Sequence, residues 1–247
     1  MDKAIKPLGG KAYGSIGHLP GSRLGPGDHR ITDGQARICA ERIRDRHDFV
    51  IVEEKLDGAN VCVARVGGAL IPLIRAGYPA ESARFEHLRM FAVWARENIG
   101  RFDAVLREGE RLAGEWLVLA HGTRYALPHE PFVALDILRN GMARVPREEF
   151  WTRVRGRFVT PNVLHAAAAP CPVTEALRRM ADGGGHGAVD PVEGAVWRVE
   201  RRGKVDFLAK YVRPDKVDGR YLPEISGGEP VWNRFQEREE GLLCSRS

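Results

Sequence analysis

Hydrophobic residues in the first half of the chain fall in short runs, which is typical of β-strands rather than of long helices. Residues 49–53 are rich in β-branched and apolar side chains, and residues 60–66 alternate with a period of two. Further runs predict strands at residues 70–75, 111–119 and 131–138. These segments are spaced closely enough to form antiparallel sheets.

Helical spacing of apolar residues appears between and after these strands. Shorter helices are predicted at residues 35–45, 146–155 and 173–182, and Thr32 or Asp33 is a candidate N-cap for the first of them. The strongest helical pattern covers residues 86–99 and predicts one buried stripe. Its apolar members are Leu88, Phe91, Ala92, Ala95 and Ile99.

The last two strands are predicted at residues 194–200 and 205–212, joined by a polar turn at residues 201–204. Strands and helices of this order predict an α+β fold, in which antiparallel β-sheets are flanked by helices on their outer faces. Residues 1–34 are rich in Gly and Pro and predict an irregular arm or a linker. We therefore divide the chain into an arm plus helix (1–48), a central domain (49–213) and a short tail (214–247).

Composition narrows the class of protein. The chain has 247 residues, of which 43% are hydrophobic and 29% charged, as in an ordinary globular protein with a core of its own. It contains no apolar run of about 18 residues, so no membrane span is expected. The four cysteines are far apart and form no CxxC pair, so the sequence indicates neither a zinc ribbon nor a thioredoxin-type redox site and favours free thiols in a cytoplasmic protein.

The net charge is a weaker indication. A formal charge of +5 and a pI near 9.2 are compatible with a phosphate-rich partner. Many basic enzymes never contact nucleic acid, however, so the charge alone does not identify the partner.

A candidate nucleophile lies in Lys55-Leu56-Asp57-Gly58, between the first two predicted strands. A lysine amine must lose a proton before it attacks phosphorus, and partial burial, nearby cations or a divalent metal can lower its pKa. Gly58 would let the turn pass close to a ligand. A surface turn is the alternative, because Asp-Gly is common in turns and KxDG alone is short.

Four later segments favour the nucleophile over the surface turn. A charged residue lies in or beside an apolar β-run in each of GEW, FVALDI, EGAV and LAKYVR. One such charge usually lies on the solvated face of a strand, but four in this order after KxDG are harder to dismiss. The charged residues are Glu115, Asp136, Glu193 and Lys210.

This ordered set resembles the covalent nucleotidyltransferases, which comprise ATP-dependent DNA and RNA ligases and mRNA capping enzymes. The resemblance extends from about residue 50 to residue 213 and is greatest to RNA ligases of the RNA ligase 2 type, on EKLDGAN and FVALDI. It implies an ATP-grasp-like adenylation domain that uses ATP with Mg²⁺ or Mn²⁺. It further implies RNA with nicked or broken ends as substrate, and a possible partner protein that supplies substrate binding.

The resemblance also implies catalytic roles for two lysines. Lys55 would attack the α-phosphorus of ATP, release pyrophosphate and hold AMP as a phosphoramidate. Lys210 would contact the α-phosphate and stabilise its developing charge. Glu193 would bind the divalent metal, as a hard oxygen ligand for a hard cation.

Further residues would surround the nucleotide. Glu54 lies where family members contact adenine, and Glu115 would accept hydrogen bonds from the ribose hydroxyls. Asn60 and Arg75 lie near the nucleotide, where a guanidinium suits phosphate or ribose. Leu135 occupies the position at which the family commonly stacks an aromatic ring on adenine.

Two departures from the family pattern leave alternatives open. Leu135 is not aromatic, and Val212 stands where a second lysine is common, with Arg213 next to it. Because strand side chains alternate, Arg213 is expected to point away from Lys210 unless the strand bulges. The alternatives are a DNA ligase, a GTP-dependent capping-type enzyme, or a catalytically inactive nucleic-acid-binding relative.

Three segments remain without a defined role. SIGHLPGSRLGPGDH is similar to a segment of a bacterial group of RNA ligases, and the sequence assigns it no mechanism. The glycine-dense residues 183–187 lack the GKS/T ending of a P-loop and predict a flexible loop. His121 and Tyr125 follow the GEW strand, and we favour a structural role for both.

Overall fold

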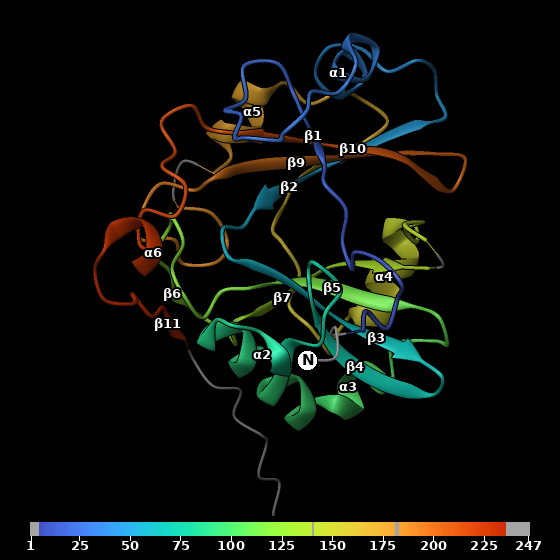
Figure 1. Cartoon of the computed structure of the whole chain (residues 1–247). Helices are drawn as coiled ribbons and strands as arrows, with labels where there is room; N and C mark the ends of the chain where they lie inside the picture. Colours follow the sequence, from blue (N-terminus) through green and yellow to red (C-terminus); the bar gives the residue numbers. More distant parts are fainter. Residues whose placement is uncertain (1–4, 140, 181–182, 236–247) are drawn as a thin grey trace, which may run out of the picture.

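Two β-sheets lie one above the other in the computed structural model, which describes residues 5–139, 141–180 and 183–235 (Figure 1). The upper sheet has the strand order β1-β10-β9-β2-β8 and the lower sheet the order β4-β3-β5-β7. The upper strands are β1 (Gly17–His18), β10 (Lys204–Val212), β9 (Gly194–Arg201), β2 (Asp48–Lys55) and β8 (Val163–Ala167). The lower strands are β4 (Ala69–Ile74), β3 (Ala59–Val66), β5 (Arg111–Trp116) and β7 (Phe132–Leu138).

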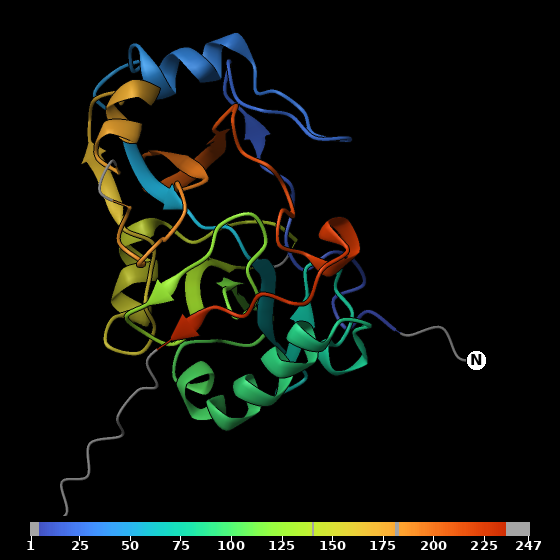
Figure 2. The same cartoon turned by 90° about the vertical axis from the view of Figure 1, so that its left-hand side faces the viewer.

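Helices cover the outer face of each sheet, as the sequence predicts (Figures 1 and 2). α1 (Asp33–Ala40) and α5 (Val173–Arg178) pack on the upper sheet, and α2 (Glu86–Glu97), α3 (Ile99–Asp103) and α4 (Arg147–Val154) pack on the lower sheet. All pairs in the lower sheet are antiparallel, whereas β1 and β10 of the upper sheet are parallel. The smaller elements are η1 (Ala80–Ser82), α6 (Pro223–Ser226) and the pair β6 (Ala126–Leu127) and β11 (Arg234–Phe235).

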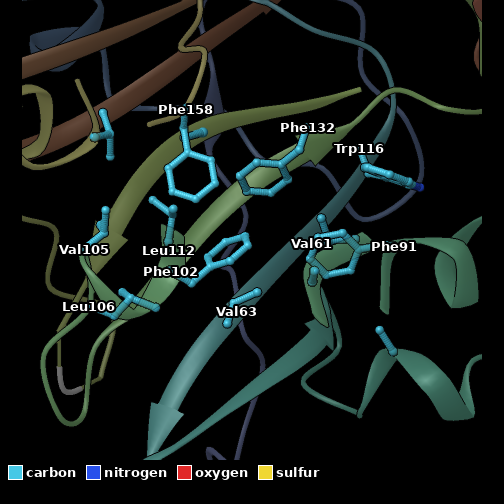
Figure 3. Packing of buried hydrophobic residues seen from close by; sticks show 14 of the residues in the cluster. Val61, Val63, Phe91, Phe102, Val105, Leu106, Leu112, Trp116, Phe132 and Phe158 are labelled. Atoms are coloured by element: carbon cyan, nitrogen blue, oxygen red, sulfur yellow. The ribbon is translucent and has the colours of Figure 1, made fainter. Parts of the chain in front are cut away.

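Each sheet shares a hydrophobic core with its helices because alternate residues of its strands point outward. Val61 and Val63 of β3 pack with Phe91 of α2 and Phe102 of α3 in the lower core (Figure 3). Trp197 of β9 is fully buried in the upper core with residues of α1 and α5. The opposite, inner faces of the two sheets are therefore available for polar side chains.

The predicted elements are found with shifted ends. Thr32 caps α1 and forms a capping box with Gln35, but the helix ends at Ala40 rather than near residue 45. The helix expected over residues 86–99 ends at Glu97, Asn98 separates it from α3, and α5 is shorter than predicted. Lys55 is the last residue of β2 and not part of the following turn.

The N-terminal arm packs on both sheets. Its residues Gly17 and His18 pair with Ala209 and Lys210 of β10, so the arm contributes the edge strand of the upper sheet. Further back, the Tyr13 hydroxyl donates to Asp136 Oδ2 of β7 over 2.7 Å. The arm thus connects the inner face of the lower sheet to the edge of the upper one (Figure 1).

The segment after β10 folds back over the same side of the molecule. The Tyr221 N–H donates to the His121 carbonyl, and the Ala120 N–H donates to the Val231 carbonyl. Figure 2 shows this segment with α6 between the two sheets at one side of the molecule. Residues 236–247, the end of the expected tail, lie outside the described residues, as does Cys244.

Two expectations from composition can be compared with the structure. Cys39, Cys62 and Cys171 are buried free thiols. In the part of the chain that the structure describes, no helix has the length and apolar character needed to cross a membrane.

Candidate active site

A cavity of about 410 Å³ lies between the inner faces of the two sheets. β2, β9 and β10 line it from above, and β3, β5 and β7 line it from below. Every residue that the sequence assigned to catalysis, nucleotide or metal lines this cavity. They are Glu54, Lys55, Asn60, Arg75, Glu115, Leu135, Glu193 and Lys210.

Lys55 and Glu193 form the centre of the site. The end of β2 carries Lys55 inward, and Glu193 directly precedes β9, so that Lys55 Nζ lies 2.5 Å from Glu193 Oε2. Burial by itself lowers the pKa of Lys55, but the carboxylates of Glu193 and Glu115 outweigh burial and raise it. The lowering that burial can cause is therefore outweighed by the two carboxylates, which stabilise Lys55 as an ammonium ion.

Glu115 of β5 lies close enough to this pair to interact electrostatically with both groups. Burial raises its pKa to about 7, and the positive charge of Lys55 only partly opposes this effect. Its Oε1 accepts a hydrogen bond from the Gly58 N–H over 3.1 Å. Glu115 therefore holds the turn after Lys55 while its carboxyl group can exist in either protonation state near neutral pH.

Gly58 is required by the close approach of the turn to β5. A Cβ at this position would lie 2.6 Å from the Trp116 carbonyl oxygen. The turn thus passes close to the backbone of β5, and this contact accounts for the glycine without a ligand.

Asp57 anchors the turn through a partner that no pattern in the sequence indicated. Lys216, in the segment after β10, places Nζ 2.5 Å from Asp57 Oδ2 and 2.5 Å from Thr123 Oγ1. The Gly122 N–H also donates to Asp57 Oδ2, and the Asp57 N–H donates to the Tyr125 hydroxyl. The structure therefore places Tyr125 behind the turn, whereas His121 lines the cavity.

Glu54, directly before Lys55, is buried against the glycine-dense loop. The Gly185 N–H donates to its Oε2 over 2.7 Å, and burial raises the pKa of its carboxyl group. Its Oε1 is buried without a hydrogen-bond partner among the described residues. Gly184 has a φ of +72° and its Cβ would lie 2.3 Å from Glu54 Oε1, so the glycine-dense loop packs directly on this carboxylate.

Asn60 and Arg75 occupy neighbouring positions on β3 and just after β4. The Asn60 side chain donates to the Gly114 carbonyl over 3.3 Å, and its Oδ1 is buried without a partner among the described residues. The two buried acceptors, Glu54 Oε1 and Asn60 Oδ1, could each accept a hydrogen bond from a bound ligand. Arg75 Nη2 lies 3.5 Å from the Gly14 carbonyl oxygen of the arm, at the limit of a hydrogen bond.

Lys210 enters the cavity from β10, beside the arm. Its Nζ lies 3.4 Å from Asp28 Oδ1, and its side chain is 17% exposed. Burial and the nearby charge of Lys55 lower the pKa of Lys210, which Asp28 and Glu193 partly restore. Lys55 and Lys210 thus bring two cationic groups into the cavity with the carboxylates of Glu115 and Glu193.

The two departures from the family pattern have structural counterparts. Leu135 lines the cavity with Val196 and Leu208, so aliphatic side chains from both sheets form its apolar part. Arg213 pairs with Asp215, Nη2 to Oδ2 over 2.6 Å, and does not line the cavity. The additional cation near the turn is Lys216, four residues beyond Val212.

The donor set limits how a metal could bind. No group of three or more His, Cys, Asp or Glu side chains suited to a metal ion occurs within residues 5–139, 141–180 and 183–235. Mg²⁺ is usually held by one or two carboxylates together with phosphate oxygens and waters. Glu193, with Glu115 nearby, fits that shared mode of binding rather than an all-protein cage.

Comparison with known proteins gives the family. The family model described as RNA ligase matches residues 48–212, more than half of the chain. No curated protein matches the chain. Solved structures with a similar fold include an archaeal ATP-dependent RNA ligase, at 20% identity and a TM-score of 0.46 over 67% of this chain and 43% of that one.

Two structures of an RNA ligase from Naegleria gruberi are also similar. One variant, with ATP and Mn, has 17% identity and a TM-score of 0.46 over 68% of this chain and 50% of that one. Another variant, also with ATP and Mn, has 15% identity and a TM-score of 0.48 over 82% of this chain and 61% of that one. The chain thus spans about half the length of these solved proteins. Its fold is α+β, as the sequence predicts, with a mixed upper and an antiparallel lower sheet. On the match to the family model, the chain belongs to the RNA ligase family.

Proposed function

We propose that the protein is an ATP-dependent RNA ligase in which Lys55 carries AMP. The observation that carries this proposal is the convergence of Lys55, Glu115, Glu193 and Lys210 on one cavity. These residues come from four separate strands or strand ends, and a structural role does not require all four to face the same space. A cavity of about 410 Å³ is within the range that takes a small-molecule ligand such as a nucleotide.

The first step is adenylylation of the lysine. Lys55 Nζ attacks the α-phosphorus of ATP, an N–P bond forms, and the bond to the pyrophosphate oxygen breaks. Glu193 lies within hydrogen-bond distance of Nζ and is placed to accept the proton that the ammonium must lose. Lys210 lines the same wall of the cavity from β10 and would stabilise the charge that develops on the α-phosphate.

The same groups then serve the two transfers to RNA. AMP passes from Lys55 to a 5′-phosphate of RNA, and a 3′-hydroxyl attacks that phosphate and releases AMP. A divalent cation, Mg²⁺ or Mn²⁺, would neutralise phosphate charge and help to align the in-line displacement. Glu193 would supply a carboxylate ligand to it.

Binding of the adenosine would use the remaining residues. Glu54 Oε1 and Asn60 Oδ1 are buried acceptors without partners among the described residues, and donors of the base or the ribose could satisfy them. Glu115 would bind the ribose hydroxyls, and Arg75 would bind phosphate or ribose. Leu135 would pack on the base in place of an aromatic ring.

Incubation with α-³²P-labelled ATP and magnesium tests the proposal. We expect a covalent label on the protein that EDTA prevents and that Lys55→Ala abolishes, while Lys204→Ala, which alters an exposed hairpin lysine, keeps it. No label on the wild type would instead favour the inactive nucleic-acid-binding alternative. Joining assays with nicked RNA, broken single-stranded RNA and nicked DNA would identify the acceptor, and sealing of DNA alone would contradict an RNA ligase.

A further inference from the structure

A chain of contacts leads from the backbone of β10 through the N-terminal arm to the side chain of Lys210. The Val212 N–H donates to Ser22 Oγ over 2.9 Å, and Ser22 Oγ lies 2.7 Å from His18 Nδ1. His18 Nε2 lies 3.1 Å from Asp28 Oδ2, and Asp28 Oδ1 lies 3.4 Å from Lys210 Nζ. His18, Ser22 and Asp28 all belong to SIGHLPGSRLGPGDH, the segment to which the sequence assigned no mechanism.

The protonation of His18 determines which atoms donate and which accept along this series of contacts. Burial and the charge of Lys210 lower the pKa of His18, so the imidazole is neutral at physiological pH and has one N–H. Asp28 as a carboxylate can only accept, so the charge of Asp28 at 3.1 Å favours the tautomer of His18 with its proton on Nε2, although the contact lacks hydrogen-bond geometry. Nδ1 then accepts from the Ser22 hydroxyl, and the imidazole holds Asp28 from one side.

Asp28 is fixed from a second side by its own turn. The Gly25 N–H donates to Asp28 Oδ2 over 2.9 Å, and His18 Nε2 lies 3.1 Å from the same oxygen, while Oδ1 faces Lys210. Burial raises the pKa of Asp28, but the Gly25 N–H, Lys210 and His18 together hold it below its usual range. Asp28 is therefore a fixed negative charge beside Lys210.

The arrangement does not support a separate hydrolase. Ser22 is 5% exposed, does not line the cavity, and its oxygen accepts from the Val212 N–H. A serine nucleophile would have to reach a substrate. The chain of contacts ends instead at Lys210, which does face the cavity.

We propose that Asp28, held by His18, is a positioning residue that keeps the ammonium group of Lys210 charged and directed along the wall of the nucleotide cavity. The inference rests on the proposed function, in which Lys210 contacts the α-phosphate. The titratable and charged groups that act electrostatically on Lys210 are Asp28 and His18 of the arm, Lys55 of β2 and Glu193 at the start of β9. Among these groups, Asp28 is the carboxylate that the arm supplies. Its negative charge opposes the repulsion between Lys55 and Lys210.

The test compares Asp28→Asn with Asp33→Asn, a control that changes an exposed acid at the start of α1. We expect Asp28→Asn to lower the rate of lysyl-AMP formation about tenfold and to move the alkaline limb of its pH profile to lower pH. Without Asp28, Lys210 loses its proton at a lower pH. Asp33→Asn should leave the rate and the profile unchanged.

Variants of His18 test whether His18 holds Asp28 in place. The amide nitrogen of His18→Gln can donate to Asp28 from nearly the position of Nε2, so this variant should retain most of the activity. His18→Ala should resemble Asp28→Asn. Thermal melting of each variant identifies any that has lost its fold, and equal loss in both His18 variants without unfolding would contradict the role of the Nε2 donor.

A measurement without ATP separates this inference from the proposed function. The pH titration of the Lys210 Cε resonance, assigned with Lys210→Arg, should show a lower pKa in Asp28→Asn than in the wild type. An unchanged titration together with an unchanged adenylylation profile would overturn the inference. If the wild type forms no lysyl-AMP but the titration shifts, the proposed function fails and the control of Lys210 by Asp28 stands.

Discussion

Lys216 and Asp57 form a buried ion pair, with Nζ and Oδ2 separated by 2.5 Å and side chains 5% and 12% exposed. The contact joins the segment after β10 to the turn that follows Lys55. Burial raises the pKa of Asp57, but Lys216 and then Lys55 outweigh this effect and lower it, so Asp57 is ionised. The pair therefore stabilises the turn with two opposite charges that are both largely removed from water.

Removing one member of this pair should destabilise the protein strongly. We expect Lys216→Met to lower the free energy of unfolding by about 3 to 5 kcal/mol, because it leaves the Asp57 carboxylate buried without its cation. Urea denaturation measures the change. The matched control is Lys204→Met at the exposed hairpin, for which we expect a change within about 0.5 kcal/mol.

The double variant Lys216→Met with Asp57→Asn provides a second check. It removes both charges, so it should recover part of the stability that Lys216→Met loses. A Lys216→Met protein as stable as the Lys204→Met control would show that the ion pair does not hold the turn.

Gly184→Ala should weaken nucleotide binding. The new Cβ would lie 2.3 Å from Glu54 Oε1, and the position has a φ of +72°. Gly203→Ala is the matched control, because its φ is +71° and no atom lies within 4 Å of its Cβ. Isothermal titration with a non-hydrolysable ATP analogue should show an affinity at least about tenfold lower for Gly184→Ala alone.

If both glycine variants lost affinity equally, backbone strain and not contact with Glu54 would explain the effect. Circular dichroism at the working temperature would show that each variant is folded before its affinity is compared.

Glu115 should make stability depend on pH in an unusual direction. Its pKa is raised from 4.5 to about 7, so between these values the folded protein binds more protons at this group than the unfolded chain does. The contribution of Glu115 to stability is therefore present below pH 4.5 and is lost as the pH rises through about 7.

Glu115→Gln removes this dependence while its amide oxygen can still accept from the Gly58 N–H. Relative to the wild type, the variant should gain stability between about pH 4.5 and 7 and show no further relative change above that range. Urea midpoints measured across these pH values provide the comparison. Parallel curves for the two proteins would mean that the Glu115 pKa is not raised.

Leu135 is expected to contribute to nucleotide affinity by packing on the adenine base. Leu135→Ala removes apolar surface from the wall of the cavity, so the affinity for the ATP analogue should fall about fivefold. Adenylylation at saturating ATP should change much less. Leu24→Ala, at an exposed leucine outside the cavity, should leave the affinity unchanged, and a similar loss in both variants would argue against contact of Leu135 with the base.

The sequence predicted the strands that carry the site because their charged residues interrupt regular apolar patterns. Lys55, Glu115, Glu193 and Lys210 each adjoin such a run, and the order of the runs identified the family. Alternation along the strands then explains why these side chains share a cavity, since the helices bury the opposite faces. These patterns and the family resemblance were therefore enough to predict that the four residues lie in one site.

The partners of these residues could not be predicted in the same way. Lys216 contacts Asp57 across 159 positions and Asp28 contacts Lys210 across 182, and no local pattern relates such distant residues. β8 was missed because Val163–Ala167 lies at the edge of its sheet and has no strict alternation of apolar and polar residues. The break at Asn98 lies inside a continuous helical pattern, so it was not foreseen either.

The path of the chain also bears on how the protein is made. Tyr13 and Ile16 near one end, and Leu222 and Ile225 near the other, line the same cavity, and His18 pairs with a strand that the ribosome adds almost two hundred residues later. During translation, the N-terminal arm therefore lacks its β-strand partner until β10 has been synthesised. Incomplete nascent chains should consequently be unable to sequester a nucleotide.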